Sequence, residues 1–103
     1  MPLSPDQKKH YRAIGHELNP LVIIADKGLT ENVLAEIERA LNDHELIKIK
    51  VNIADRDAKS AAIAAVCAQT GATLVQSIGR VALILRRVKT PNPKLSNLVR
   101  FKQ

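Results

Sequence analysis

The order of apolar segments along the chain predicts an α/β fold, with a compact mixed four-stranded sheet and three helices in the order α-β-α-β-α-β-β. Three observations support this class: a length of 103 residues that suits one domain, helical patterns lying between strand-like runs, and two closing strands separated by only two residues. Because βαβ crossovers are right-handed and join parallel strands, we expect the first three strands to be parallel and the closing strand antiparallel to them.

The first helix is predicted to begin after Ser4, which can cap it, with Pro5 at the first helical position and Gln7 completing a capping box. It should run to about Ile14, where Gly15 is suited to the left-handed residue that ends a helix. The short apolar run over 21–25 then predicts a buried strand.

The second helix is predicted from the cap Thr30 to about Asp43, because its apolar residues recur at helical spacing. From residue 46 to 53 apolar residues alternate with polar ones, which predicts a strand covered on one face and presenting Lys48 and Lys50 on the other. The third helix is capped by Asp55 or Asp57 and ends at Gly71. Strands over 72–78 and 81–85 follow, joined by a type II′ turn at Gly79-Arg80.

The segment from residue 86 onward combines two prolines and six basic residues with scattered apolar ones. We therefore expect a folded domain over residues 1–87 and a basic tail over 88–103 that is mobile or ordered by a partner.

Composition excludes several classes of protein. With 46% hydrophobic and 25% charged residues the chain is globular rather than disordered. No apolar run approaches the roughly 18 residues of a membrane span, and the first residues do not form a secretory signal, so we expect a cytoplasmic protein without membrane contact. The single cysteine, Cys67, allows neither an internal disulfide nor a zinc site by its spacing.

Charge is distributed unevenly. Residues 1–57 hold eight basic and ten acidic residues, whereas residues 58–103 hold eight basic residues and no acidic one. A basic half of this kind favours binding to a polyanion, since neutralising phosphates releases condensed counterions. The alternative is that the charge serves solubility alone.

No arrangement of residues indicates catalysis, a metal or a cofactor. The three histidines have neither ligand nor triad spacing, Asp55 and Asp57 are explained by helix capping, and Cys67 falls among the apolar positions of a helix. We therefore expect a protein that is not an enzyme.

Binding residues are easier to place. Ala25, Asp26, Lys27 and Gly28 link the first strand to the helix capped by Thr30, where free N–H groups and the helix dipole can receive a phosphate. The alternative is a plain turn in which Gly28 supplies an unusual backbone angle.

Basic side chains elsewhere complete the candidate site. Lys8, Lys9 and Arg12 form a stripe on the first helix that can follow a nucleic-acid backbone or simply be solvated, and we expect Arg80 and Arg86 to be exposed flanking charges. Tyr11 and Phe101 are the only aromatic residues besides histidine, so contacts with phosphates, sugars and overall shape are favoured over base stacking.

Four stretches resemble a known family: Gly28-Leu29-Thr30-Glu31, Val33-Leu34-Ala35-Glu36-Ile37, His44-Glu45-Leu46-Ile47-Lys48 and Ile78-Gly79-Arg80. Together they are similar to the bacterial YhbY-type CRM domain, the chloroplast RNA splicing and ribosome maturation family, over roughly residues 2–87. The resemblance implies a fold similar to the C-terminal domain of translation initiation factor three. It also implies RNA binding through a KH-like Gly-x-x-Gly loop, here 25–28 with Ala25 in place of the first glycine.

The resemblance further implies a function in ribosome biogenesis. We expect a monomeric assembly factor that binds large-subunit ribosomal RNA or precursor large ribosomal subunits. The alternative is a protein-interaction module that docks on ribosomal proteins or another assembly factor.

Overall fold

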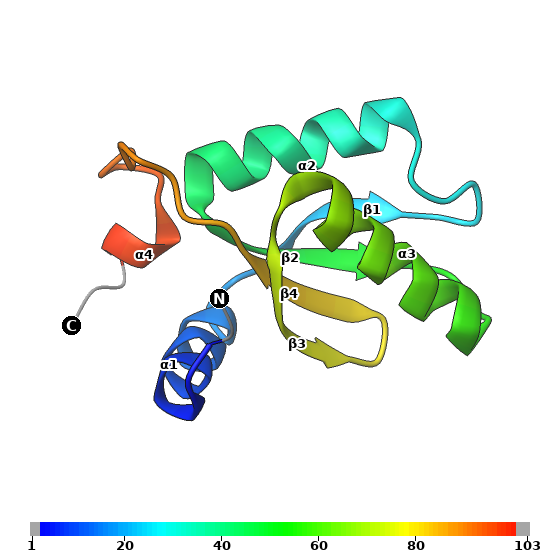
Figure 1. The fold of residues 1–103 in the computed structure, drawn as a ribbon, viewed down its shortest axis with the longest axis horizontal. Helices are drawn as coiled ribbons and strands as arrows, with labels where there is room; N and C mark the ends of the chain where they lie inside the picture. Colours follow the sequence, from blue (N-terminus) through cyan, green and yellow to red (C-terminus); the bar gives the residue numbers. More distant parts are fainter. Residues whose placement is uncertain (1–2, 101–103) are drawn as a thin grey trace.

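The computed structural model describes residues 3–100, which form four helices and four strands (Figure 1). The order α-β-α-β-α-β-β is confirmed, and one short helix that the sequence did not predict follows it. The elements are α1 (Pro5–Gly15), β1 (Pro20–Ile24), α2 (Glu31–His44), β2 (Leu46–Val51), α3 (Arg56–Thr70), β3 (Thr73–Ile78), β4 (Val81–Leu85) and α4 (Asn97–Arg100).

The strands form one sheet in the order β1-β2-β4-β3. β1 pairs with β2 in parallel, and β4 is antiparallel to both of its neighbours. The expected directions are therefore confirmed, because β1, β2 and β3 all run the same way. β4 lies between β2 and β3, so those two parallel strands do not pair with each other.

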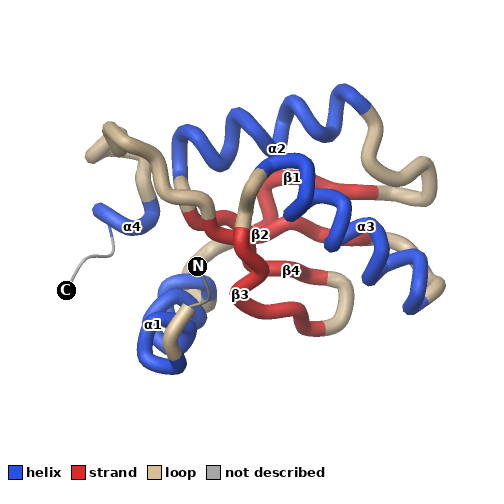
Figure 2. Tube along the Cα trace, in the orientation of Figure 1, coloured by secondary structure: helices blue, strands red, loops and turns tan. Residues whose placement is uncertain are grey.

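Helices cover both faces of the sheet, as Figure 2 shows. α2 and α3 pack on one face over a first core, whereas α1 and α4 contact the other face over a smaller second core. The first core contains Val22, Ile24, Ile37, Leu41, Ile47, Ile49, Val51, Ile63, Val66 and Ile84 among its buried residues. The second contains Tyr11, Ile14, Leu46, Val75, Leu83 and Leu85.

The predicted caps are present. Ser4 and Gln7 form a capping box on α1, the Thr30 side chain accepts from the N–H of Val33, and Asp55 rather than Asp57 caps α3. Gly71 ends α3 in the left-handed conformation. Gly79 has a φ of 57°, and Arg80 is not among the residues with positive φ, which agrees with the expected type II′ turn.

Two local expectations are wrong. Gly15 is the last residue of α1 and does not have a positive φ. It is needed for space instead, because a Cβ there would lie 2.7 Å from Cδ2 of the buried Leu83. β1 is not buried on both faces: Val22 and Ile24 enter the first core, whereas Leu21 and Ile23 are exposed, since β1 is an edge strand covered by helices on one side only.

Residues 88–100 lie against the body of the domain, which the sequence did not predict. The centre of this contact is Glu45, a buried residue with a φ of 62°. Its carboxylate accepts from the N–H of Val88 at 2.9 Å and from the hydroxyl of Ser96 at 2.7 Å. The Asn97 amide donates to the carbonyl oxygen of Leu46 at 2.6 Å. Residues 1–2 of the expected domain and 101–103 of the expected tail lie outside the described residues.

We predict that Ser96→Ala lowers the free energy of unfolding by about 1–3 kcal/mol, because a buried carboxylate oxygen of Glu45 loses its hydroxyl donor. Urea titration of the variant measures the change, with Ser60→Ala on the exposed side of α3 as the control. A loss for Ser96→Ala no larger than about 0.5 kcal/mol, the range of ordinary surface changes, contradicts the prediction.

Candidate nucleic-acid interface

The loop between β1 and α2 is a tight, exposed turn. The N–H of Gly28 donates to the carbonyl oxygen of Ala25 at 2.8 Å, and the N–H of Thr30 donates to that of Gly28 at 3.1 Å. Gly28 has a φ of 77°, so the expectation that it supplies an unusual backbone angle is confirmed. A Cβ at Gly28 would meet nothing within 4 Å, so the turn is open to a ligand on that side.

The amino end of α2 follows this turn directly. The Thr30 hydroxyl accepts from the N–H of Val33 at 3.2 Å, while geometry leaves other first-turn N–H groups without an acceptor inside the helix. The side chains of Asp26 and Lys27 are both exposed beside this helix end. Lys27 adds to the positive end of the helix dipole and Asp26 opposes it, so Lys27 is the residue that favours an anion here.

The hairpin turn between β3 and β4 lies at the same end of the sheet as this loop, toward the right in Figure 1. Asn52 connects the two: its N–H donates to the carbonyl oxygen of Ile24 at 2.7 Å, and its side-chain oxygen accepts from the Arg80 guanidinium at 2.7 Å. Lys59 of α3 donates to the carbonyl oxygen of Gly79 at 2.6 Å. The fold thus brings Lys27, Gly28, Thr30 and Arg80 to one end of the sheet.

Sequence reasoning missed Asn52 and Lys59 as members of this end. Asn52 directly follows the last residue of β2, and the carboxyl ends of parallel strands are where α/β sheets gather functional groups. The position of Asn52 directly after a strand could therefore have indicated that it belongs to this end of the sheet. The contact between Lys59 and Gly79 joins residues 20 positions apart, and no local pattern indicates it.

The basic stripe on α1 is exposed as expected, but it lies elsewhere. Lys8, Lys9 and Arg12 are all exposed, with Lys8 and Arg12 one helical turn apart. Figure 1 places α1 toward the opposite end of the molecule from the 25–28 loop. A single RNA that touches both surfaces must run along the molecule, whose longest dimension is 38 Å.

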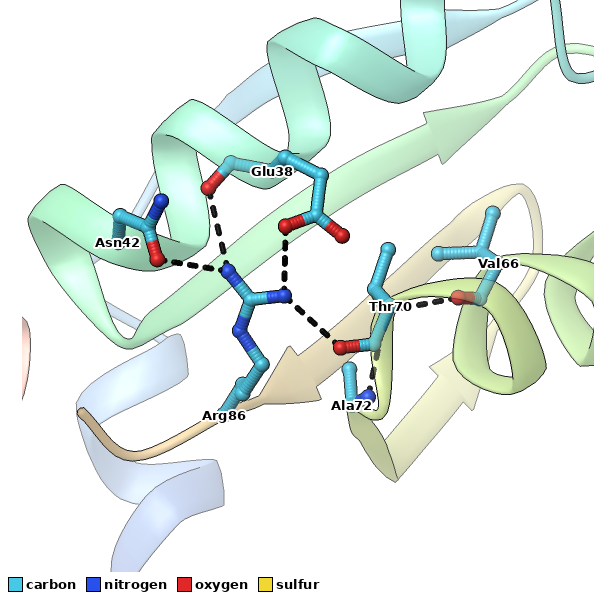
Figure 3. Close-up of polar contacts among 6 residues, drawn as sticks. All are labelled: Glu38, Asn42, Val66, Thr70, Ala72 and Arg86. Atoms are coloured by element: carbon cyan, nitrogen blue, oxygen red, sulfur yellow. Dashed lines mark hydrogen bonds and ion pairs between the residues drawn. The ribbon is translucent and has the colours of Figure 1, made fainter.

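Arg86 is not the exposed charge that the sequence suggested. Its side chain is only 19% exposed and lies between α2 and the end of α3 (Figure 3). Nη1 is 2.8 Å from both Glu38 Oε2 and the carbonyl oxygen of Thr70. Nη2 donates to Asn42 Oδ1 at 2.8 Å and to the Glu38 carbonyl oxygen at 3.3 Å. The guanidinium therefore joins β4 to two helices.

The neighbouring Arg87 is exposed and faces α1. Its guanidinium donates to the Tyr11 hydroxyl, and its central carbon lies 5.9 Å from the centre of the Tyr11 ring. Tyr11 is buried in the second core, so its ring is not available for stacking on a base.

Two of the histidines and the cysteine contact other parts of the fold. His44 Nδ1 lies 2.8 Å from the carbonyl oxygen of Leu95, and His10 lies against Tyr11 with ring centres 5.6 Å apart. Cys67 packs against the first core, and burial raises the pKa of its thiol, which disfavours a reactive thiolate. Among residues 3–100 no group of three or more His, Cys, Asp and Glu residues is placed to hold a metal ion. None of the described helices is long and apolar enough to cross a membrane.

The fold and this end of the sheet define an α/β domain with an exposed, partly cationic turn where parallel strands finish. The model of the CRS1/YhbY (CRM) domain family matches residues 3–86. The chain therefore belongs to the CRM domain family, and the resemblance found in the sequence is confirmed.

Relatives and a solved structure agree with this assignment. The chain is 54% identical over 101 residues to a protein of Pseudomonas aeruginosa named "probable RNA-binding protein", covering 98% of this chain and 97% of that one. It is 50% identical over 84 residues to a protein of Haemophilus influenzae named "RNA-binding protein", covering 82% and 85%. The solution structure of a hypothetical protein from Staphylococcus aureus is similar with a TM-score of 0.76 at 31% identity, covering 91% and 97%.

We predict that Arg86→Lys lowers the free energy of unfolding by about 1–3 kcal/mol, because one ammonium group cannot replace a guanidinium that bonds Glu38, Thr70 and Asn42 together. Thermal and urea unfolding measure the loss. Arg39→Lys, at an exposed position of α2, is the matched control and should change stability by less than about 0.5 kcal/mol. Equal stabilities for the two variants contradict the structural role of Arg86.

Proposed function

We propose that this chain is a non-catalytic RNA-binding protein that contacts phosphates with the 25–28 loop, the amino end of α2 and Arg80. The observation that carries the proposal is the convergence of Lys27, Gly28, Thr30 and Arg80 at one end of the sheet. The names of the Pseudomonas and Haemophilus relatives support RNA as the ligand. Family membership supports it as well.

The mode of binding follows from the side chains available. Tyr11 is buried, so the described residues offer no exposed tyrosine, phenylalanine or tryptophan ring for stacking bases. An open glycine turn, backbone N–H groups and lysine or arginine side chains suit phosphate oxygens, which carry little sequence information. We therefore expect recognition of RNA shape and backbone, with Lys8, Lys9 and Arg12 as additional contacts.

The RNA that we propose is large-subunit ribosomal RNA within precursor large ribosomal subunits, with the protein acting as an assembly factor. Shape recognition suits this target, because folded ribosomal RNA presents fixed arrangements of phosphates. We propose that the protein acts in the cytoplasm as a monomer, without a membrane partner.

We predict that Lys27→Ala weakens binding to a large-subunit ribosomal RNA precursor and reduces the slope of log K against log salt by about one, because one phosphate contact is lost. Fluorescence anisotropy over a salt series measures both quantities. Lys27→Arg should keep the wild-type slope, and Arg39→Ala, which removes an exposed charge from the side of α2, is the control. An unchanged slope and affinity for Lys27→Ala remove Lys27 from the site.

A second prediction concerns the ribosomal particle. In sucrose gradients of lysate at low salt the protein should sediment with immature large subunits, and it should leave them as salt rises because the contacts are to phosphates. Blotting locates the protein, and analysis of ribosomal RNA in the same fractions identifies the particle. A protein that stays at the top of the gradient at low salt contradicts stable ribosomal association.

A further inference from the structure

The sheet face that carries the second core is only partly covered by helices. α1 packs over Leu83 and Leu85, and Leu98 of α4 joins the same cluster. The register places Ile23, Lys50, Val81 and Ile78 in one row across all four strands. Val22, Ile24 and Ala82 point to the first core, so the alternation of side chains puts this row on the opposite face, outside the second core.

Large aliphatic side chains on this bare part of the sheet are open to solvent. Ile78 is 64% exposed and Ile23 is 57% exposed. They come from β1 and β3, the two edges of the sheet, and Val81 lies half-buried between them. Single exposed aliphatic residues are ordinary, but several on one sheet face are typical of an interaction surface.

The surface is also hollowed beside α1. A cavity of about 230 Å³ lies between the end of that helix and the sheet, lined by His16, Lys48, Gln76, Ile78, Val81 and Leu83. We call the part of this face that α1 and α4 leave open, formed by Ile23, Lys48, Lys50, Ile78 and Val81, the bare sheet face.

The charge of the bare sheet face has one sign. Lys48 and Lys50 belong to β2, a central strand, and lie between the aliphatic side chains of the two edge strands. None of the four strands contains an acidic residue. Two copies of the chain meeting through this face would bring four lysines together, which disfavours self-association. An RNA would meet aliphatic side chains where an RNA-binding sheet normally offers aromatic ones.

The spacing of the two lysines fits an acidic helix. Residues two apart on a strand are about 6.6 Å apart, and residues four apart on a helix are separated by about 6 Å along the axis. A helix lying along β2 can therefore set two carboxylates against Lys48 and Lys50, with apolar residues on either side of them meeting Ile23 and Ile78. α1 already covers the neighbouring part of the same face with the apolar side chains of Tyr11 and Ile14.

We propose that the bare sheet face binds an amphipathic, acidic helical segment of a partner protein. The bare sheet face contains neither the 25–28 loop nor Arg80, but it adjoins the proposed RNA contacts, because Ile78 and Val81 flank Gly79 and Arg80. A chain that binds RNA at one end of the sheet and a helical segment on this face would hold the partner protein next to the RNA.

The test is site-specific photocrosslinking in the native cells with the full chain. A benzophenone amino acid replaces Ile78 on the bare sheet face or, as the control, Glu36 on the exposed side of α2. After irradiation and nuclease treatment, mass spectrometry identifies the crosslinked peptide. We expect a protein adduct at position 78 only, in a segment that carries at least two acidic residues at helical spacing.

Variants make the result specific. Lys48→Glu with Lys50→Glu should reduce the adduct at least about tenfold because like charges then meet, whereas Lys48→Arg with Lys50→Arg should keep it within about twofold. Ile23→Ser should also reduce it, and circular dichroism checks that each variant is folded. An adduct of two copies, an adduct with RNA, a partner segment without acidic residues, or equal yields at positions 78 and 36 each overturn the proposal.

Discussion

The insertion of β4 between β2 and β3 is the constraint on which the rest of the arrangement depends. Because β4 is antiparallel to both neighbours, its first residue lies where β1 and β2 end, and its last residue lies where they begin. The hairpin turn therefore lies at the same end of the sheet as the 25–28 loop. The chain after Leu85 enters the space between α2 and α3, where Arg86 bonds Glu38. The pairing of β4 with β2 and β3 thus determines where the hairpin turn lies at one end of the sheet and where Arg86 lies at the other.

Two arginines, one at each end of β4, have different roles because of where they lie in the fold. Arg80 precedes the strand, is exposed, and bonds only Asn52 through its guanidinium among the described contacts, so it remains open to a further anion. Arg86 follows the strand and makes four hydrogen bonds to α2 and α3. The same side chain is therefore part of a candidate binding surface at one end and part of the scaffold at the other.

Local signals in the sequence predicted most of the fold, and non-local ones account for what was missed. Ser4, Thr30, Asp55 and Gly71 act within a few residues of themselves, so their helix ends could be predicted. The unbroken apolar run of β1 shows no alternation, so nothing in it indicated that Leu21 and Ile23 face solvent. In the candidate site, Lys27 and Gly28 follow from the strand-turn-helix pattern. The burial of Arg86 depends on Glu38, 48 residues away, and could not be predicted.

The bonds around Glu45 bear on how far the domain extends. The family model ends at residue 86, yet the Glu45 carboxylate takes its donors from Val88 and Ser96, and the second core includes Leu98. A version of this module transplanted into another protein and cut at the family boundary would expose a carboxylate that the intact chain buries. The folded domain therefore extends to about residue 100. A fusion partner joined after α4 would begin on the side of the molecule away from the 25–28 loop (Figure 1).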